Sequence, residues 1–227
     1  WRSLEPPCTS GYRRIVILSA TETSTRVAPT RLRVKFWGVR GSFPTPRSAN
    51  LGFGGNTTCI QVETPASDEV LIFDAGTGIR ELGSNLLSTR KGPLKIHLLL
   101  THFHWDHVLG LPFFAPAYNP GNELTIYATN FVAPLEPSIT AVMSYPHFPV
   151  VMLKDLPHIR FHKLDSGPIQ LAGAKILPFR VNHPQGSCGY QIRSSGATVL
   201  FVPDREGGDE QLDLEIRKIA QGADLLI

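Results

Sequence analysis

The feature that most constrains this chain is a dense group of metal-binding residue types placed directly after an apolar strand pattern. The run KIHLLLT (95–101) has the apolar continuity of a strand buried inside a sheet. HFHWDH (102–107) follows without a break and holds three histidines and one aspartate. Incidental histidines on a surface loop are a poor explanation for this density. We therefore expect the end of a buried strand to open onto a polar site.

The spacing inside this group favours a metal centre. His102 and His104 lie two residues apart, so they share a face if the extended geometry of the strand persists. Asp106 and His107 enter the start of a helix and can face the same cavity from the other side. Zinc, manganese and iron all accept imidazole nitrogen and carboxylate oxygen as ligands. Two neighbouring groups of ligands predict two divalent metal ions about 3.5–4 Å apart, with zinc as the first choice and manganese or iron as alternatives.

The rest of the chain reads as many strands with helices between them. Strand patterns precede the histidine group in RRIVILSA (13–20, a short strand), RLRVKFW, TTCIQVE and EVLIFD, and follow it in ELTIYA, IRFHKL, AKILPFRV, CGYQIR, ATVLFVP and ADLLI. Helices are expected after Thr77, which we take as an N-cap, near 131–144, and over 209–221. This order predicts two sheets with helices outside them. The Gly- and Pro-rich loop at 38–56 is long enough to suggest a function.

The length of the chain indicates one domain, and its positive charge is concentrated near the N-terminus. The 227 residues suit one domain. Residues 1–30 have turn and linker chemistry and are interpreted as an appendage, with the domain over 31–227. Residues 1–33 carry six arginines and two glutamates, which leaves the rest of the chain close to neutral. A near-neutral body predicts no broad nucleic-acid-binding surface, and no apolar run approaches the length of a membrane helix.

The cysteines indicate a reducing compartment. There are three, Cys8, Cys59 and Cys188, and a sparse, odd-numbered set argues against a disulfide framework. We therefore expect a cytoplasmic protein.

The histidine group resembles the HxHxDH motif of the metallo-β-lactamase superfamily. FWGVRGSFPTP, FGGNTTC, LIFDAGTGIRELG and THFHWDHVLGLPFFAPAY are together similar to a branch of these metal-dependent hydrolases. That branch is related to ribonuclease Z and the cyclic-nucleotide phosphodiesterases, and the similarity covers roughly residues 33–227. It implies an α+β fold, a four-layer αββα sandwich of two mixed β-sheets flanked by helices.

The resemblance also implies the remaining site residues. His183 in VNHPQGSCGY and Asp204 in VLFVPD match the two further ligands. The first metal is then held by His102, His104 and His183, the second by Asp106 and His107, with Asp204 between them. Asp74 matches an aspartate that orients a ligand histidine.

The Gly-rich loop is expected to reach the substrate. Gly54, Gly55 and Asn56 match a family loop near the site, where small residues let the backbone approach closely. Arg40 is able to meet a substrate phosphate with two hydrogen bonds, and a structural ion pair within the loop is an equally open interpretation. We take Gly55, Asn56 and Arg40 as candidate substrate-binding residues.

The ligand types indicate the chemistry. A metal-bound water or hydroxide attacks the substrate, a metal polarises a substrate oxygen, and Asp106 orients the water as the catalytic residue. The β-lactamases of the superfamily typically have a cysteine at the position of Asp204 and lack a ligand at that of His107. The chain thus favours phosphodiesters of the cyclic-nucleotide or RNA type. A thioester or other carbonyl substrate is the first alternative, and a non-catalytic metal-binding module with a degenerate site is the second.

Two expectations concern the end of the chain and its partners. Relatives continue after ADLLI with a segment that carries the last histidine of the second metal and the presumed general acid. The resemblance thus implies a C-terminally incomplete domain whose second site is short of one ligand. The expected partner is a small-molecule or nucleotide substrate, and the homodimers common among relatives make a homodimer an expectation here.

Overall fold

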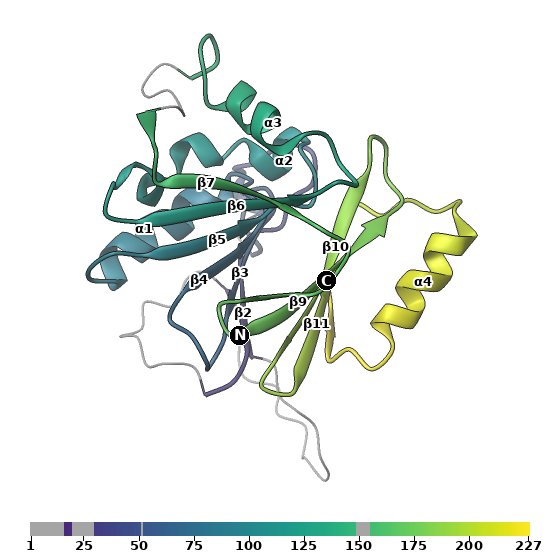
Figure 1. The fold of residues 1–227 in the computed structure, drawn as a ribbon. Helices are drawn as coiled ribbons and strands as arrows, with labels where there is room; N and C mark the ends of the chain where they lie inside the picture. The colour runs from purple at the N-terminus through teal and green to yellow at the C-terminus, as the bar shows by residue number, and fades with distance from the viewer. Residues whose placement is uncertain (1–15, 20–29, 51, 149–154) are drawn as a thin grey trace.

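Two β-sheets face each other, and helices cover the outer face of each (Figure 1). The computed structural model describes residues 16–19, 30–50, 52–148 and 155–227. The layers are helices, first sheet, second sheet and helix, which confirms the predicted αββα sandwich of two mixed sheets.

The elements are as follows. The first sheet contains β1 (Val16–Ser19), β2 (Arg33–Gly38), β3 (Cys59–Glu63), β4 (Val70–Phe73), β5 (Lys95–Leu99), β6 (Glu123–Thr129) and β7 (Ile159–Leu164), in this order. The second sheet contains β8 (Ile169–Leu171), β9 (Ala174–Val181), β10 (Ser187–Ser194), β11 (Ala197–Phe201) and β12 (Leu225–Leu226). The helices are α1 (Gly78–Thr89), α2 (Trp105–Val108), α3 (Leu135–Val142) and α4 (Glu210–Ala220), with short 3₁₀ turns at Ser48–Asn50, Leu111–Phe113 and Ala115–Tyr118.

The parallel part of the first sheet determines where the polar site lies. Strands β4 to β7 run parallel to one another, so their carboxyl ends meet at one edge, which is where α/β sheets bind ligands. Asp74 follows β4 directly, and its N–H donates to Leu99 O at the end of β5 (3.0 Å). This bond places Asp74 beside the segment that leads into the histidines.

The apolar core of the described residues divides into three clusters, one for each interface between layers. One joins the first sheet to α1 and α3, and includes Ile79, Leu98 and Ile139. The second fills the space between the sheets, and the third packs Ile216 of α4 on the second sheet. Alternate residues of β5 therefore serve different clusters, as a strand covered on both faces requires.

Most strand predictions are confirmed, and two details differ. Strand β8 was not expected, because its three residues are too few to show a period. Val16–Ser19 form β1, which pairs in parallel with β2 and lies within the expected strand pattern RRIVILSA (13–20). Most of residues 1–30, including Cys8, lie outside the described residues, so the division at residue 30 stays a prediction. Thr77 precedes α1 but does not cap it, since its hydroxyl accepts from Thr57 N (2.9 Å) and donates to Asn56 Oδ1 (3.1 Å).

Among the described residues, no helix has the length and apolar character needed to cross a membrane.

Close backbone packing at Gly76 holds α2 against the loop after β4. A side chain added at this position is therefore expected to lower stability. A Cβ on Gly76 would lie 2.2 Å from Asp106 O and 2.6 Å from Thr58 O, both backbone atoms. Gly76→Ala is thus expected to lower the free energy of unfolding by about 1–3 kcal/mol, measured by urea denaturation. Gly167→Ala is the matched control, because no atom lies within 4 Å of its added Cβ. Equal stability of both variants would contradict the tight packing.

Candidate metal centre

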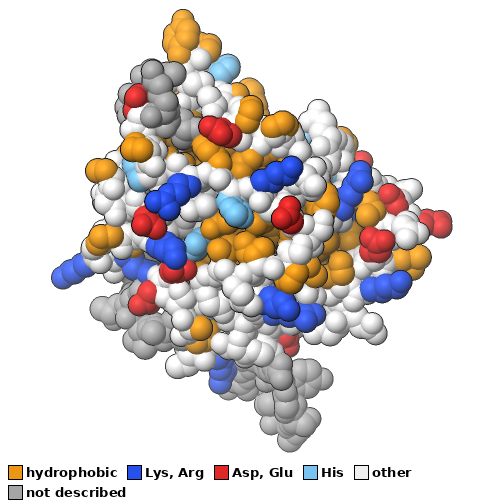
Figure 2. Space-filling view, in the orientation of Figure 1, with side chains coloured by type: hydrophobic (Ala, Val, Ile, Leu, Met, Phe, Trp, Pro, Cys, Tyr) orange, Lys and Arg blue, Asp and Glu red, His pale blue; other side chains and the backbone are white. Residues whose placement is uncertain are grey.

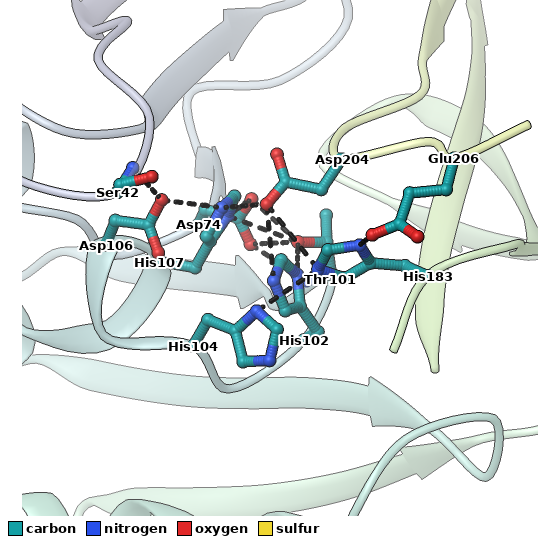
Figure 3. Close-up of polar contacts among 10 residues, drawn as sticks. All are labelled: Ser42, Asp74, Thr101, His102, His104, Asp106, His107, His183, Asp204 and Glu206. Atoms are coloured by element: carbon teal, nitrogen blue, oxygen red, sulfur yellow. Dashed lines mark hydrogen bonds and ion pairs between the residues drawn. The ribbon is translucent and has the colours of Figure 1, made fainter. Parts of the chain in front are cut away.

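The six predicted metal ligands lie together, although they come from both sheets (Figure 3). His102 and His104 follow β5, and Asp106 and His107 lie in α2. His183 follows β9 and Asp204 follows β11, in the second sheet. Two hydrogen bonds tie the halves together beside the cluster, from Tyr190 Oη to Leu100 O (2.6 Å) and from Cys188 N to Thr101 O (2.9 Å).

The first group of ligands contains His102, His104, His183 and Asp204. Each offers one atom, and these atoms all lie within 4.8 Å of one another. His183 Nε2 is 3.1 Å from His104 Nδ1 and 3.9 Å from Asp204 Oδ2, which is 3.5 Å from His102 Nε2. Three imidazoles and a carboxylate around one point are a donor set that suits zinc.

The second group contains Asp106, His107 and Asp204, again within 4.8 Å of one another. His107 Nε2 lies 3.2 Å from Asp204 Oδ2 and 3.5 Å from Asp106 Oδ2. Asp204 therefore belongs to both groups, and the bridging of two metals that the resemblance implies for it stays a prediction.

One buried nitrogen indicates that the cluster fits a cation. His102 Nε2 is buried and has no hydrogen-bond partner among the described residues. The Thr101 hydroxyl donates to Asp74 (2.9 Å), so it accepts from His102 Nδ1–H (3.1 Å) and leaves the Nε2 lone pair facing the cluster. A buried acceptor without a partner is costly, and a metal ligand at this nitrogen removes that cost.

The two most buried histidines of the cluster have opposite pKa shifts. Burial lowers the pKa of His107, but Asp74, Asp106 and Asp204 outweigh this effect and raise it to about 12. Burial, together with His107 and His104, lowers the pKa of His102 to about 3. His102 is therefore neutral, which is the form that binds a metal.

Asp74 contacts His107 at Nδ1, the ring nitrogen that faces away from Asp204. It is fully buried, accepts from His107 Nδ1–H (2.8 Å), and also accepts from the Thr101 N–H (2.8 Å) and hydroxyl. Thr101 was not predicted as a functional residue, although it directly precedes the motif. It links Asp74 to His102, so one carboxylate orients two ligands.

Ser42 is a second residue that the sequence reasoning missed. Its N–H donates to Asp106 Oδ2 (2.6 Å) and joins the long Gly/Pro loop to the metal centre. Ser42, Asp74 and Asp204 all have positive φ, at 63°, 61° and 48°. This left-handed conformation is uncommon outside glycine and clusters at functional sites.

The three candidate substrate-binding residues have structural contacts within their loops. Arg40 Nε donates to Gly54 O (2.9 Å), a hydrogen bond to backbone and not an ion pair. Asn56 accepts at its backbone carbonyl from the N–H groups of Val39 and Arg40 (both 3.0 Å). A Cβ on Gly55 would lie 2.4 Å from Thr45 O. These contacts explain the residue types, and contact with substrate stays a prediction.

The fold agrees with the comparisons to known proteins. The sequence model of the family described as "Beta-lactamase superfamily domain" matches residues 70–227. The chain therefore belongs to the metallo-β-lactamase superfamily, whose fold implies divalent metal binding.

Individual relatives are distant. An uncharacterized protein of Mycobacterium leprae is 28% identical over 198 residues, which cover 82% of this chain and 66% of that protein. The ribonuclease Z of Staphylococcus carnosus is 25% identical over 171 residues, which cover 72% of this chain and 50% of that enzyme. The metallo-β-lactamase fold protein YhfI from Bacillus subtilis has a TM-score of 0.60 at 18% identity, covering 86% of this chain and 69% of that one. The chain thus spans between about half and two thirds of the curated relatives named here.

Proposed function

We propose that this protein is a metal-dependent hydrolase that binds two divalent metal ions and cleaves phosphodiesters of the cyclic-nucleotide or RNA type. The observation that carries the proposal is the pair of adjoining ligand groups that share Asp204. Zinc is the proposed metal, because histidines provide most of the donors.

Different residues in and beside the cluster have different proposed roles around the metals. When bound, a metal pair would supply an acidified water and would polarise a substrate oxygen. The Ser42 N–H donates to Oδ2 of Asp106, which fixes this carboxylate 3.5 Å from His107 Nε2. Asp106 then acts as the residue that orients the attacking water. Asp74 accepts from His107 Nδ1–H and thereby orients the ring so that Nε2 faces Asp204.

The donor atoms favour a phosphodiester over a lactam. Asp204 provides a carboxylate where a β-lactamase of the superfamily typically has a thiolate. Cys188 does not replace it, because that thiol is buried between the sheets and burial raises its pKa to about 12. Two oxygen-containing metal sites suit a substrate whose reacting group is negatively charged.

Exposed aromatic side chains beside the site support a nucleotide substrate. Phe43 is 69% exposed and Trp105 is 74% exposed, and they directly follow and precede the residues joined by the Ser42–Asp106 bond. Aromatic rings placed in this way provide faces on which nucleobases stack. The similarity to a ribonuclease Z also supports a substrate of the RNA type.

The face drawn in Figure 2 shows no continuous basic surface, because its Lys and Arg side chains are interspersed with Asp and Glu. The proposal is thus for a small nucleotide or an RNA end, recognised close to the metals, and not for a long nucleic acid held over a wide surface.

Parallel assays of the full-length protein test this function. We expect turnover of a chromogenic phosphodiester and of cyclic nucleotides, complete loss with a chelator, and recovery when zinc or manganese is added back. The same samples are tested with a glutathione thioester. Preferred thioester hydrolysis would replace the proposed substrate class. Metal binding without either activity would indicate a non-catalytic module, and absence of bound metal would contradict the proposal as a whole.

A further inference from the structure

Besides Asp74, a second carboxylate contacts a histidine of the metal site from outside the two ligand groups. Glu206 Oε1 lies 3.2 Å from His183 Nδ1 (Figure 3). The other ring nitrogen, His183 Nε2, faces the cluster at 3.1 Å from His104 Nδ1. The ring of His183 thus bridges Glu206 on one side and the candidate ligands on the other.

We propose that Glu206 is a positioning residue that raises the metal affinity of the first ligand group by fixing His183. The carboxylate accepts from Nδ1–H, which selects the tautomer with a free lone pair on Nε2 and orients the ring toward the metal. This inference rests on the proposed metal site and assigns to Glu206 no contact with substrate or with the reacting atoms.

The backbone around Glu206 is held in place independently of its side chain. Glu206 N–H donates to Asn182 O (2.8 Å), and Asn182 Nδ2 donates to Glu206 O and Gly207 O (both 3.2 Å). These bonds join the loop after Asp204 to the segment just before His183. The carboxylate is therefore presented to His183 at a distance set by the backbone.

His183 has more need of such a contact than His102 and His107 have. Its side chain is 13% exposed, whereas those of His102 and His107 are 2% and 1% exposed. Thr101 already orients His102, and Asp74 orients His107. Glu206 completes the same arrangement for the histidine that the second sheet provides.

Because the Glu206 side chain is largely exposed, its effect on metal binding can be measured apart from any effect on protein stability. Its side chain is 55% exposed, and an ion pair in such a position contributes little to folding. Removal of the carboxylate is therefore expected to change metal binding and to leave the thermal unfolding of the metal-free protein almost unchanged.

Metal affinity measured by competition with a zinc-binding indicator tests the inference on full-length protein. Glu206→Ala is expected to raise the zinc dissociation constant of the first group about 10-fold, the low end of the range for residues that orient ligands. Glu206→Gln keeps an oxygen that accepts from Nδ1–H, so it is expected to recover most of the affinity. Glu210→Ala removes the same charge from an exposed position at the start of α4 and serves as the matched control.

Each outcome decides a different point. Equal zinc affinity for the wild type and Glu206→Ala would overturn the inference and leave the proposed function standing. An equal loss in Glu206→Ala and Glu210→Ala would also overturn it, because the effect would then be one of net charge. A wild-type protein that binds no zinc, manganese or iron would overturn the inference together with the proposed function.

Discussion

Replacing His102 with alanine is expected to abolish metal-dependent hydrolysis, with a fall in kcat/KM of about 1,000-fold or more, which corresponds to about 4 kcal/mol of lost transition-state stabilisation. His102 is the buried member of the first ligand group, and its Nε2 lone pair faces Asp204 at 3.5 Å. Its loss removes the most buried of the four candidate ligands in the first group. Zinc content per chain and turnover of a chromogenic phosphodiester measure the effect.

His97→Ala is the matched control for this substitution. His97 is also buried and lies on β5, but its ring nitrogens contact Tyr127 Oη (2.9 Å) and Glu69 Oε2 (3.0 Å), outside both ligand groups. We expect it to lower stability and to leave zinc content intact. If His102→Ala kept its metal and its activity, the assignment of the first group would be wrong.

The second large effect is expected at Asp74, where one buried carboxylate meets His107 and Thr101. Asp74→Ala removes the buried partner of His107 Nδ1–H and of the Thr101 N–H and hydroxyl, and it is expected to lower the free energy of unfolding by about 3–5 kcal/mol. The positive φ of this position adds a penalty for alanine. Urea denaturation with chelator present measures this loss without a contribution from bound metal.

Asp74→Asn separates charge from shape. Asparagine tolerates positive φ and can still accept from the Thr101 N–H, but its amide no longer accepts from His107 Nδ1–H. We expect a smaller loss of stability than in Asp74→Ala, together with weaker metal binding. Asp165→Ala, at an exposed position, controls for the loss of one negative charge. A change below about 1 kcal/mol in Asp74→Ala would mean that the buried network is not stabilising.

The sequence alone predicted much of this architecture, for physical reasons that differ between elements. Strand β5 and the histidines after it were recognisable because a continuous apolar run and a dense donor set are both local signals. Ile79, Leu82 and Leu86 are buried and follow the helical period, so α1 was also predictable from the sequence. His183 and Asp204 were different, since they depended on resemblance and not on spacing.

What the sequence did not reveal depends on backbone groups and on contacts between distant segments. The Ser42 N–H bond to Asp106 involves a main-chain donor that every residue type except proline carries. Glu206 is one of many acidic residues until the loop after β11 folds onto the end of β9. Thr77 had the right type and place for a cap, but its hydroxyl found partners at Asn56 and Thr57 instead. No local pattern distinguishes between such partners.

The origin of the candidate ligands in two different sheets would couple metal binding to folding. An ion held by His102 and His104 from the first sheet, and by His183 and Asp204 from the second, would resist any opening that separates the layers. By mass action, free metal at 100 times its dissociation constant stabilises the native state by about 2.7 kcal/mol. The concentration of free metal would then determine the stability of the folded protein as well as the proposed hydrolysis.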